Sequence, residues 1–269
     1  MNQLRIRKFD PSTIKPFRII LIVGKRGCGK TTLLRDLMYR LRNDIDFAMA
    51  MCPTLESATM LKASIPESCV FDRFLPSKVE QLLALAQQLA TAHKERHFLF
   101  VADDVLYDKA VLKQAAMRHL FFNGRHMRVT FIVLAQYMMD LPADLRAQID
   151  YLFVMRENIV SNRLRLYKYL FGCVPTFDEF CALMDRCTQN YECLCLDNTC
   201  HDSQVHNCVF WYKAAADLPT FTLGRESFHK LDTKYKRAER LEHVEECGRA
   251  RRLVVVKEED EEQEASDVR

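Results

Sequence analysis

One short segment constrains the fold of this 269-residue chain more than any other. Residues 17–32 contain the pattern G-x-x-x-x-G-K-[ST], in which Gly24 is the first glycine and Lys30 the lysine. An apolar β-branched run, Ile19–Val23, precedes the pattern, and a helical apolar repeat over 33–41 follows it. A strand, a glycine-rich turn and a helix in this order are typical of a phosphate-binding loop.

The residue types of this loop indicate how it would hold a nucleotide. Successive backbone N–H groups would face phosphate oxygens, and the positive end of the following helix dipole would favour the same anion. Lys30 would reach the β- and γ-phosphates of ATP, and the Thr31 hydroxyl would bind Mg²⁺. The residues expected to bind the nucleotide are nine consecutive positions: Gly24, Lys25, Arg26, Gly27, Cys28, Gly29, Lys30, Thr31 and Thr32.

Composition narrows the class of protein. A hydrophobic fraction of 49% is ordinary for a globular domain with a core, and a net charge of +3 does not mark the whole chain as a nucleic-acid binder. The longest apolar runs are too short to cross a bilayer, and the N-terminus has no secretion signal, so we expect no membrane segment and reduced cysteines.

Seven of the eleven cysteines fall between Cys173 and Cys208, near two histidines. A zinc site is disfavoured because no C-x-x-C pair occurs. Cys193 and Cys195 alternate along an expected strand, which suits buried small apolar side chains.

Strand-like apolar runs alternate with helical patterns, which predicts an α/β fold with a mostly parallel central sheet flanked by helices. A late pair of strands is expected to form an antiparallel hairpin at the sheet edge. Ser77 with Glu80 is expected to cap one helix as a capping box. The expected strands are Arg18–Val23, Phe47–Cys52, Cys69–Phe74, His97–Ala102, Val129–Ala135, Tyr151–Met155, Tyr191–Leu196 and Cys208–Trp211. The expected helices are Gly29–Arg42, Leu55–Ala63, Ser77–His93, Lys109–Phe122, Ser161–Leu170, Phe177–Cys187 and Phe228–Val244.

The charge pattern divides the chain into residues 1–224, the ATPase domain, and 225–269, a tail. Lysine and arginine are dense over Arg225–Arg252, and an acidic run over Lys257–Glu264 follows. A run of like charges is typical of a disordered, solvated segment, and an interaction tail is the alternative.

A second motif supplies acidic residues at the end of an apolar strand. Asp103 and Asp104 follow Phe98–Ala102, so Asp103 is expected to hold Mg²⁺ opposite Thr31, and Asp104 to orient and deprotonate a water. Two adjacent acids favour hydrolysis over transfer to a small acceptor. The chain lacks the Asn-Lys-x-Asp element of a GTPase and a convincing lid of a metabolite kinase.

Two further polar residues are candidates for the γ-phosphate end. Gln136 follows the apolar strand Val129–Ala135 and is expected to sense the γ-phosphate and hold the attacking water. Arg125 is a candidate arginine finger supplied by a neighbouring subunit, which would make assembly necessary for turnover. A surface arginine without a role is the alternative.

These motifs, in this order, resemble the FtsK/HerA superfamily of DNA-pumping ATPases. They resemble more closely the genome-packaging ATPases of nucleocytoplasmic large DNA viruses, the poxvirus and phycodnavirus type. The resemblance covers residues 15–215 and rests on the loop, the Asp103–Asp104 strand, Asn123–His126, the Gln136 strand, Ile149–Asn158, Ser161–Arg163, Pro175–Phe177 and Asn190–Cys193.

The resemblance implies a RecA-like core, ATP and Mg²⁺ as cofactors, and a homo-oligomeric ring around double-stranded DNA. It also implies a capsid component as partner, and a place at the virus assembly site in the host cytoplasm and in the virion. Asp104 stands where cellular members carry glutamate. Arg156 and Arg163 are weaker candidates, which could form salt bridges at a subunit interface or contact DNA.

The function that follows is an ATP-hydrolysing motor that translocates double-stranded viral DNA into the capsid. Phosphate contacts suit a motor because they are independent of base sequence. A helicase or remodelling ATPase and a nucleotide-gated switch protein are the alternatives.

Overall fold

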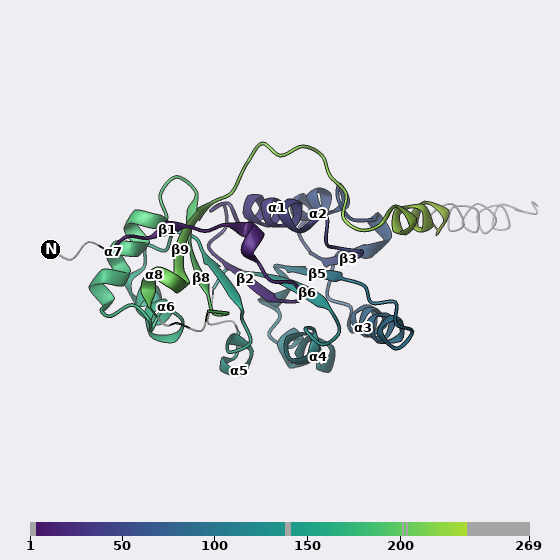
Figure 1. Ribbon diagram of the computed structural model, residues 1–269, viewed down its shortest axis with the longest axis horizontal. Helices are drawn as coiled ribbons and strands as arrows, with labels where there is room; N and C mark the ends of the chain where they lie inside the picture. Colours follow the sequence, from purple (N-terminus) through teal and green to yellow (C-terminus); the bar gives the residue numbers. More distant parts are fainter. Residues whose placement is uncertain (1–3, 138–140, 201, 203, 236–269) are drawn as a thin grey trace, which may run out of the picture. The chain divides into compact units, whose positions relative to one another are not determined.

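The computed structural model describes residues 4–137, 141–200, 202 and 204–235. They contain a nine-stranded sheet in the order β1-β9-β8-β7-β2-β6-β5-β3-β4 (Figure 1). Among these strands only β8 runs against the others. The strands are β1 (Arg7–Lys8), β2 (Ile19–Val23), β3 (Phe47–Met51), β4 (Val70–Phe71), β5 (Phe98–Asp103), β6 (Val129–Ala135), β7 (Tyr151–Val154), β8 (Glu192–Asp197) and β9 (Val209–Lys213).

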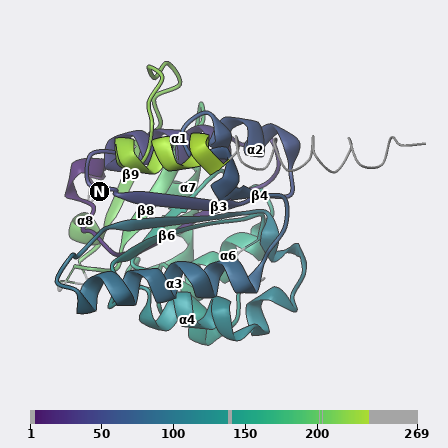
Figure 2. The same ribbon diagram turned by 90° about the vertical axis from the view of Figure 1, so that its right-hand side faces the viewer.

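Helices cover both faces of this sheet. Figures 1 and 2 show α1 and α2 over one face and α3 and α4 over the other. The first pair is α1 (Lys30–Leu41) and α2 (Leu55–Lys62). The remaining helices are α3 (Pro76–Thr91), α4 (Ala115–Asn123), α5 (Ala143–Arg146), α6 (Val160–Tyr169), α7 (Phe177–Cys187) and α8 (Val205–Cys208).

The central strands are buried on both faces, so their sequences are continuously apolar instead of alternating. In β2, Ile20 and Ile22 pack in the core beneath α1 and α2, whereas Leu21 and Val23 pack in the core on the other face. Each face of the sheet therefore has its own hydrophobic core. The mostly parallel α/β arrangement expected from the sequence is confirmed.

The late antiparallel hairpin is also confirmed, because β8 pairs with β9 and Cys193 and Cys195 are buried in it. It does not form the edge, since β1 lies outside β9 in parallel register. The sequence gives little sign of β1, because the strand has only two residues, both charged and exposed.

Two local predictions were wrong. Ser77 does not cap α3, because the helix begins one residue earlier, at Pro76. Proline is preorganised for the first helical position and needs no N–H partner there. The helix expected from Lys109 begins only at Ala115, because Gln114 is extended (ψ 139°) and separates it from a short 3-10 turn. The capping box occurs instead at Thr176, whose hydroxyl accepts from the Glu179 N–H at 3.2 Å.

Among the described residues, 4–229 belong to one compact unit and 230–235 to a second. The predicted tail begins at Arg225, but Arg225 pairs with Asp46, and the Phe228 ring packs on Phe47 at 5.3 Å. Residues 226–235 are helical, and the acidic run lies outside the described residues. Nowhere in the described part is there a helix long and apolar enough to span a bilayer.

Candidate nucleotide-binding site

The phosphate-binding motif lies where three parallel strands end. β2 is hydrogen bonded to β6, and β6 to β5, so their carboxyl ends meet at one edge of the sheet. The loop after β2, the acids that end β5 and the glutamine after β6 therefore converge there. Ligands of open α/β sheets bind at this edge, outside the carboxyl ends of the strands.

The loop is packed tightly against the sheet. The Gly24 N–H donates to the Ala135 carbonyl at 3.1 Å. A Cβ at Gly24 would lie 2.6 Å from the Cys28 sulfur and 2.7 Å from the Met155 Cβ. Gly29 adopts φ +99° directly before α1, a region that favours glycine. Glycine at these two positions lets the backbone approach β7 and then enter the helix.

Lys30 is almost fully buried in this loop, with 8% of its surface exposed. Its ammonium donates to the carbonyls of Gly24 at 2.8 Å and Lys25 at 3.0 Å. An ammonium group has three N–H donors, so one remains for a phosphate oxygen. The loop therefore holds the Lys30 ammonium where its positive charge would attract a bound phosphate.

Asp103 ends β5 beneath the loop and is 3% exposed. Burial raises the pKa of its carboxyl, the neighbouring Asp104 raises it further, and hydrogen bonds from Ser57 and the Cys52 thiol oppose this rise. Thr31 and Asp103 line the same cleft, and together they offer a hydroxyl and a carboxylate oxygen. Mg²⁺ prefers oxygen ligands of this kind and keeps several waters, so this donor set fits the ion.

Asp104 and Gln136 lie side by side above the strand ends. The Gln136 amide donates to the Asp104 carboxylate at 3.3 Å. Asp104 adopts φ +53°, which is uncommon for a residue other than glycine and places its side chain differently from that of Asp103. Arg26 from the loop lines the same hollow as this pair. The two predicted water-binding residues are therefore brought together.

These residues surround a cleft of about 780 Å³. The predicted loop residues Arg26, Gly27, Gly29, Lys30, Thr31 and Thr32 line it, as do Asp103 and Asp104. Sequence reasoning did not assign Ser57, Tyr191 or Lys213, which line it too. Ser57 follows β3 in an ordinary helical pattern, Tyr191 precedes β8 and Lys213 ends β9, so neither spacing nor residue type pointed to the site.

Glu157 is a further residue without an assigned role in the sequence reasoning. Its carboxylate pairs with Lys25 at 3.0 Å and accepts from the Ile159 N–H at 2.8 Å and the Asn162 amide at 3.0 Å. Burial opposes ionisation, but these donors outweigh it and lower the pKa of Glu157. Glu157 thus ties the phosphate-binding loop to the start of α6.

Arg125 lies at the other end of β6 from Gln136. It precedes Val129, and the seven-residue strand β6 at ~3.3 Å per residue separates the two ends by about 23 Å. The Arg125 side chain is exposed. Within one subunit, the structure therefore does not bring Arg125 to the cleft.

The two other arginines differ from each other. Arg163 is buried, pairs with Asp185 at 2.7 and 3.2 Å, and donates to the Glu157 carbonyl at 2.6 Å. Its guanidinium therefore joins α6 to α7 within the chain and is not presented to DNA. Arg156 is exposed, bonds Asn158 at 3.0 Å, and lines a small hollow together with Gly24 and Gln136.

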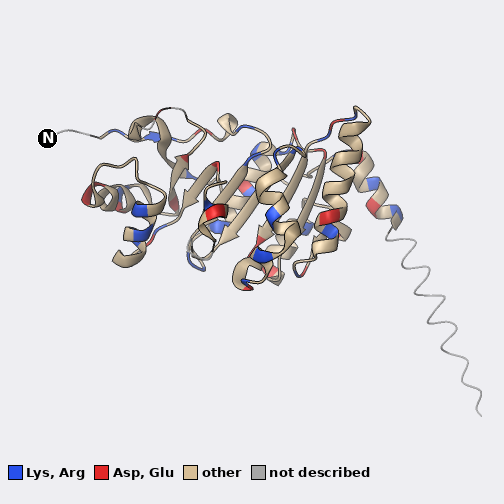
Figure 3. Ribbon diagram, turned by 90° about the horizontal axis from the view of Figure 1, so that it is seen from below, with Lys and Arg blue, Asp and Glu red and all other residues tan. Residues whose placement is uncertain are grey.

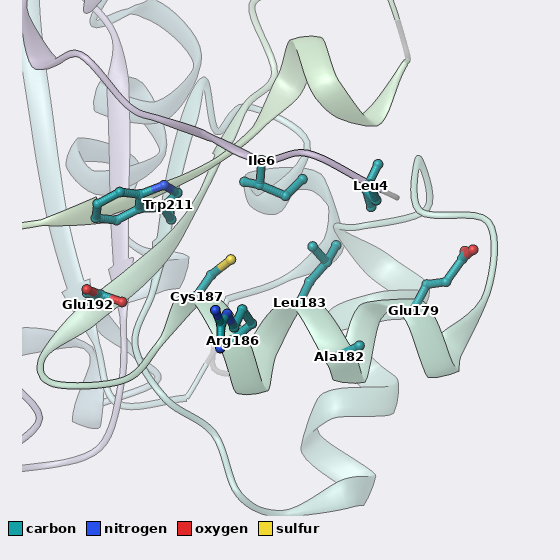
Figure 4. Close-up of a pocket in the computed structure, with 9 residues that line it drawn as sticks. All are labelled: Leu4, Ile6, Glu179, Ala182, Leu183, Arg186, Cys187, Glu192 and Trp211. Atoms are coloured by element: carbon teal, nitrogen blue, oxygen red, sulfur yellow. The ribbon is translucent and has the colours of Figure 1, made fainter. Parts of the chain in front are cut away.

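A separate hollow, of about 480 Å³, lies between the N-terminal segment and α7. Figure 4 shows Leu4, Ile6 and Leu183 around it, with Trp211 beside them. Glu179 already caps α7, and neither a glycine loop nor a buried lysine faces this hollow. It has no phosphate-binding elements. Over the described residues, no cluster of three or more histidine, cysteine or acidic side chains could hold a metal ion.

The chain is similar in sequence to proteins of several viruses. The profile of a family described as "Poxvirus A32 protein" matches residues 7–209. The chain is 34% identical over 199 residues to uncharacterized protein 088R of Invertebrate iridescent virus 3, which covers 72% of this chain and 75% of that protein. It is 25% identical over 244 residues to uncharacterized protein L437 of Acanthamoeba polyphaga mimivirus, which covers 87% and 85% respectively.

One solved structure that resembles this chain is the genome packaging NTPase B204 from Sulfolobus turreted icosahedral virus 2, in complex with AMPPCP. The TM-score is 0.53 with 17% identity, over 75% of this chain and 100% of that chain. At this identity the match shows the fold alone. The phosphate-loop NTPase fold expected from the sequence is confirmed.

Proposed function

This chain belongs to the family of the poxvirus A32 protein, and we propose that it is an ATP-hydrolysing motor that translocates double-stranded viral DNA into the capsid. One observation supports the ATP-hydrolysing part of this proposal most directly. Lys30, Thr31 and Asp103 line one cleft with Asp104, and Gln136 donates to Asp104. This arrangement has a place for the phosphates, a metal ligand pair and a water-binding pair.

Each residue then has a separate task. Lys30 would bind the β- and γ-phosphates, while Thr31 and Asp103 would hold Mg²⁺, which would supply positive charge to neutralise the phosphates. Asp104 accepts a proton from the attacking water. Gln136 orients that water and contacts the γ-phosphate, and its hydrogen bond to Asp104 couples the two.

The proposed finger Arg125 acts between subunits. Because about 23 Å of strand separates it from the Gln136 end of β6, it can serve only a neighbouring copy. The motor would accordingly be a ring in which one subunit completes the site of the next. A ring around duplex DNA also gives the contacts to phosphates that translocation needs.

A mixing experiment tests this arrangement. The Lys30→Ala variant lacks the side chain that binds the phosphates but keeps Arg125. The Arg125→Ala variant keeps the phosphate-binding loop but lacks the arginine finger. We expect each variant alone to be inactive, Arg125→Ala to bind ATP normally, and a mixture of the two to regain ATPase activity. A fully active Arg125→Ala protein would rule out the finger, and normal activity of Lys30→Ala would refute the site.

Double-stranded DNA is the proposed partner, and its contacts would be to phosphates. Arg225, the first residue of the basic segment, is already paired with Asp46. In Figure 3 basic and acidic residues are interspersed over the elements seen from that side. A triplex-displacement assay on linear duplex DNA would detect translocation, whereas a strand-displacement assay would detect a helicase. DNA-stimulated turnover without either would favour a nucleotide-gated switch.

The setting of this activity is part of the proposal. A packaging motor would act at the virus assembly site in the host cytoplasm, dock on a capsid component and remain with the virion. Detection of the protein at assembly sites of infected cells and in purified virions would support that setting, and its absence from both would contradict it.

A further inference from the structure

Tyr191 is an exposed aromatic side chain among the residues that line the nucleotide cleft. It is 72% exposed, although it directly precedes the buried strand β8. Its ring lies against the phosphate-binding loop, where a Cβ at Gly29 would be 3.4 Å from the tyrosine Cδ1. Tyr191 is not among the residues of either hydrophobic core, so packing in the core does not explain the position of this ring.

The backbone holds this ring in place at a conformational cost. Asn190 and Tyr191 have φ of +50° and +63°, and the Glu192 N–H donates to the Gln189 carbonyl at 2.8 Å. Two central residues with positive φ define a type I′ turn, which favours asparagine followed by glycine. Tyrosine thus occupies the position where glycine fits best.

Both ends of this turn are fixed by regular structure. Thr188 is buried at the end of α7 and donates to the Met184 carbonyl at 2.5 Å, and the Gln189 amide donates to the Asp185 carbonyl at 2.9 Å. On the other side, Glu192 begins β8. The ring is therefore carried by a short, anchored turn rather than by a long loop.

The other residues that line the cleft indicate which part of a nucleotide would lie beside Tyr191. Lys30 and Asp103 mark the end that holds the β- and γ-phosphates, so the nucleoside must extend away from them. Thr32, Lys213, Ala214 and Ala216 line the cleft as well. The two alanine side chains offer an apolar surface and no hydrogen-bonding group.

We propose that Tyr191 is a stacking platform for the nucleobase of the bound nucleoside triphosphate. The inference rests on the proposed function, because it takes the cleft to be a nucleotide site. An aromatic ring recognises the face of a base and not its hydrogen-bonding edge, and stacking is tolerant of base identity. Purines have the larger face, so ATP and GTP should bind alike and more tightly than CTP and UTP.

Binding of two probes to four proteins tests the platform. The probes are ATP and inorganic tripolyphosphate, which has the phosphates but no base, and the proteins are wild type, Tyr191→Ala, Tyr191→Phe and Lys30→Ala. We expect Tyr191→Ala to weaken ATP binding about tenfold or more and to leave tripolyphosphate binding unchanged. Tyr191→Phe should bind both probes like wild type, and Lys30→Ala should lose both.

The control is Tyr169→Ala, which removes an exposed tyrosine from α6, away from the cleft. It should bind ATP normally. If Tyr191→Ala bound ATP as tightly as wild type while Lys30→Ala did not, the platform would be refuted and the phosphate site would stand. Equal loss of both probes in Tyr191→Ala would also refute it, since the ring would then only support the loop. Wild-type protein that bound neither probe would refute both proposals.

Discussion

Two constraints favour glycine in the phosphate-binding loop: close contact with neighbouring side chains and a positive φ. Replacing three glycines by alanine, one at a time, separates these constraints. At Gly24 an added Cβ would lie 2.6–2.8 Å from the side chains of Cys28 and Met155. At Gly27 nothing lies within 4 Å, but φ is +76°. At Gly172 there is open space and φ is not in the left-handed region. The series therefore contains a clash, a strained backbone and a matched control without either.

The expected sizes follow from these contacts. Relief of the clash at Gly24 requires the loop and the end of β7 to separate by about 1 Å, and such overpacking costs roughly 1–3 kcal/mol. A left-handed alanine at position 27 costs roughly 1–2 kcal/mol. Gly172→Ala should be neutral or about 0.5 kcal/mol more stable, because it reduces the entropy of the unfolded chain.

Thermal melts and steady-state ATPase assays measure both consequences. At about 2–4 °C per kcal/mol, Gly24→Ala should melt roughly 2–12 °C below wild type and Gly172→Ala at or slightly above it. A 1 Å displacement of the loop should lower kcat/KM of Gly24→Ala about 100-fold, with Gly172→Ala unaffected. Equal melting temperatures and activities for these two variants would refute the close approach of the loop to β7.

Three other predictions concern stability. Burial lowers the pKa of His97, with Arg128 adding to this effect and Asp44 and Asp46 opposing it. The unfolded chain therefore takes up a proton near pH 6.5 that the folded chain resists, so melting temperature should fall from pH 7.5 to 5.5, and His97→Gln should flatten that decline. Arg163→Ala should lower the free energy of unfolding by about 1–3 kcal/mol in urea melts, because it leaves the Glu157 carbonyl without its donor, whereas Arg118→Ala, in an exposed pair, should change it by less than ~0.5 kcal/mol. Tyr191→Gly should raise stability by about 0.5–1 kcal/mol by relieving the positive φ while it weakens ATP binding, and a loss of stability would contradict the strain assigned to that turn.

Sequence patterns predicted the central strands well because those strands are short, apolar and buried on both faces. β2, β5 and β6 are continuous apolar runs bounded by polar or glycine-rich segments. The convergence of the motif residues that follow these strands could also be predicted, since parallel strands place their carboxyl ends along one edge of the sheet. The position of Asp104 beside Gln136 is thus a consequence of the order β5-β6 in the sheet.

Other parts of the site depend on contacts that no local pattern encodes. Arg163 reads as an exposed helical arginine, yet Asp185, 22 residues later, and the Glu157 carbonyl hold it in a buried position. Tyr191 is placed by the tight turn between α7 and β8, and its approach to Gly29 is a tertiary contact. Such pairings become visible only when α6, α7 and the loop are packed together.

The most direct test of the motor is steady-state ATPase activity measured across protein concentration, with and without linear duplex DNA. If Arg125 completes the site of a neighbouring subunit in a ring on DNA, turnover per subunit should rise steeply with both protein concentration and DNA. Turnover that is indifferent to both would contradict a DNA-driven assembly.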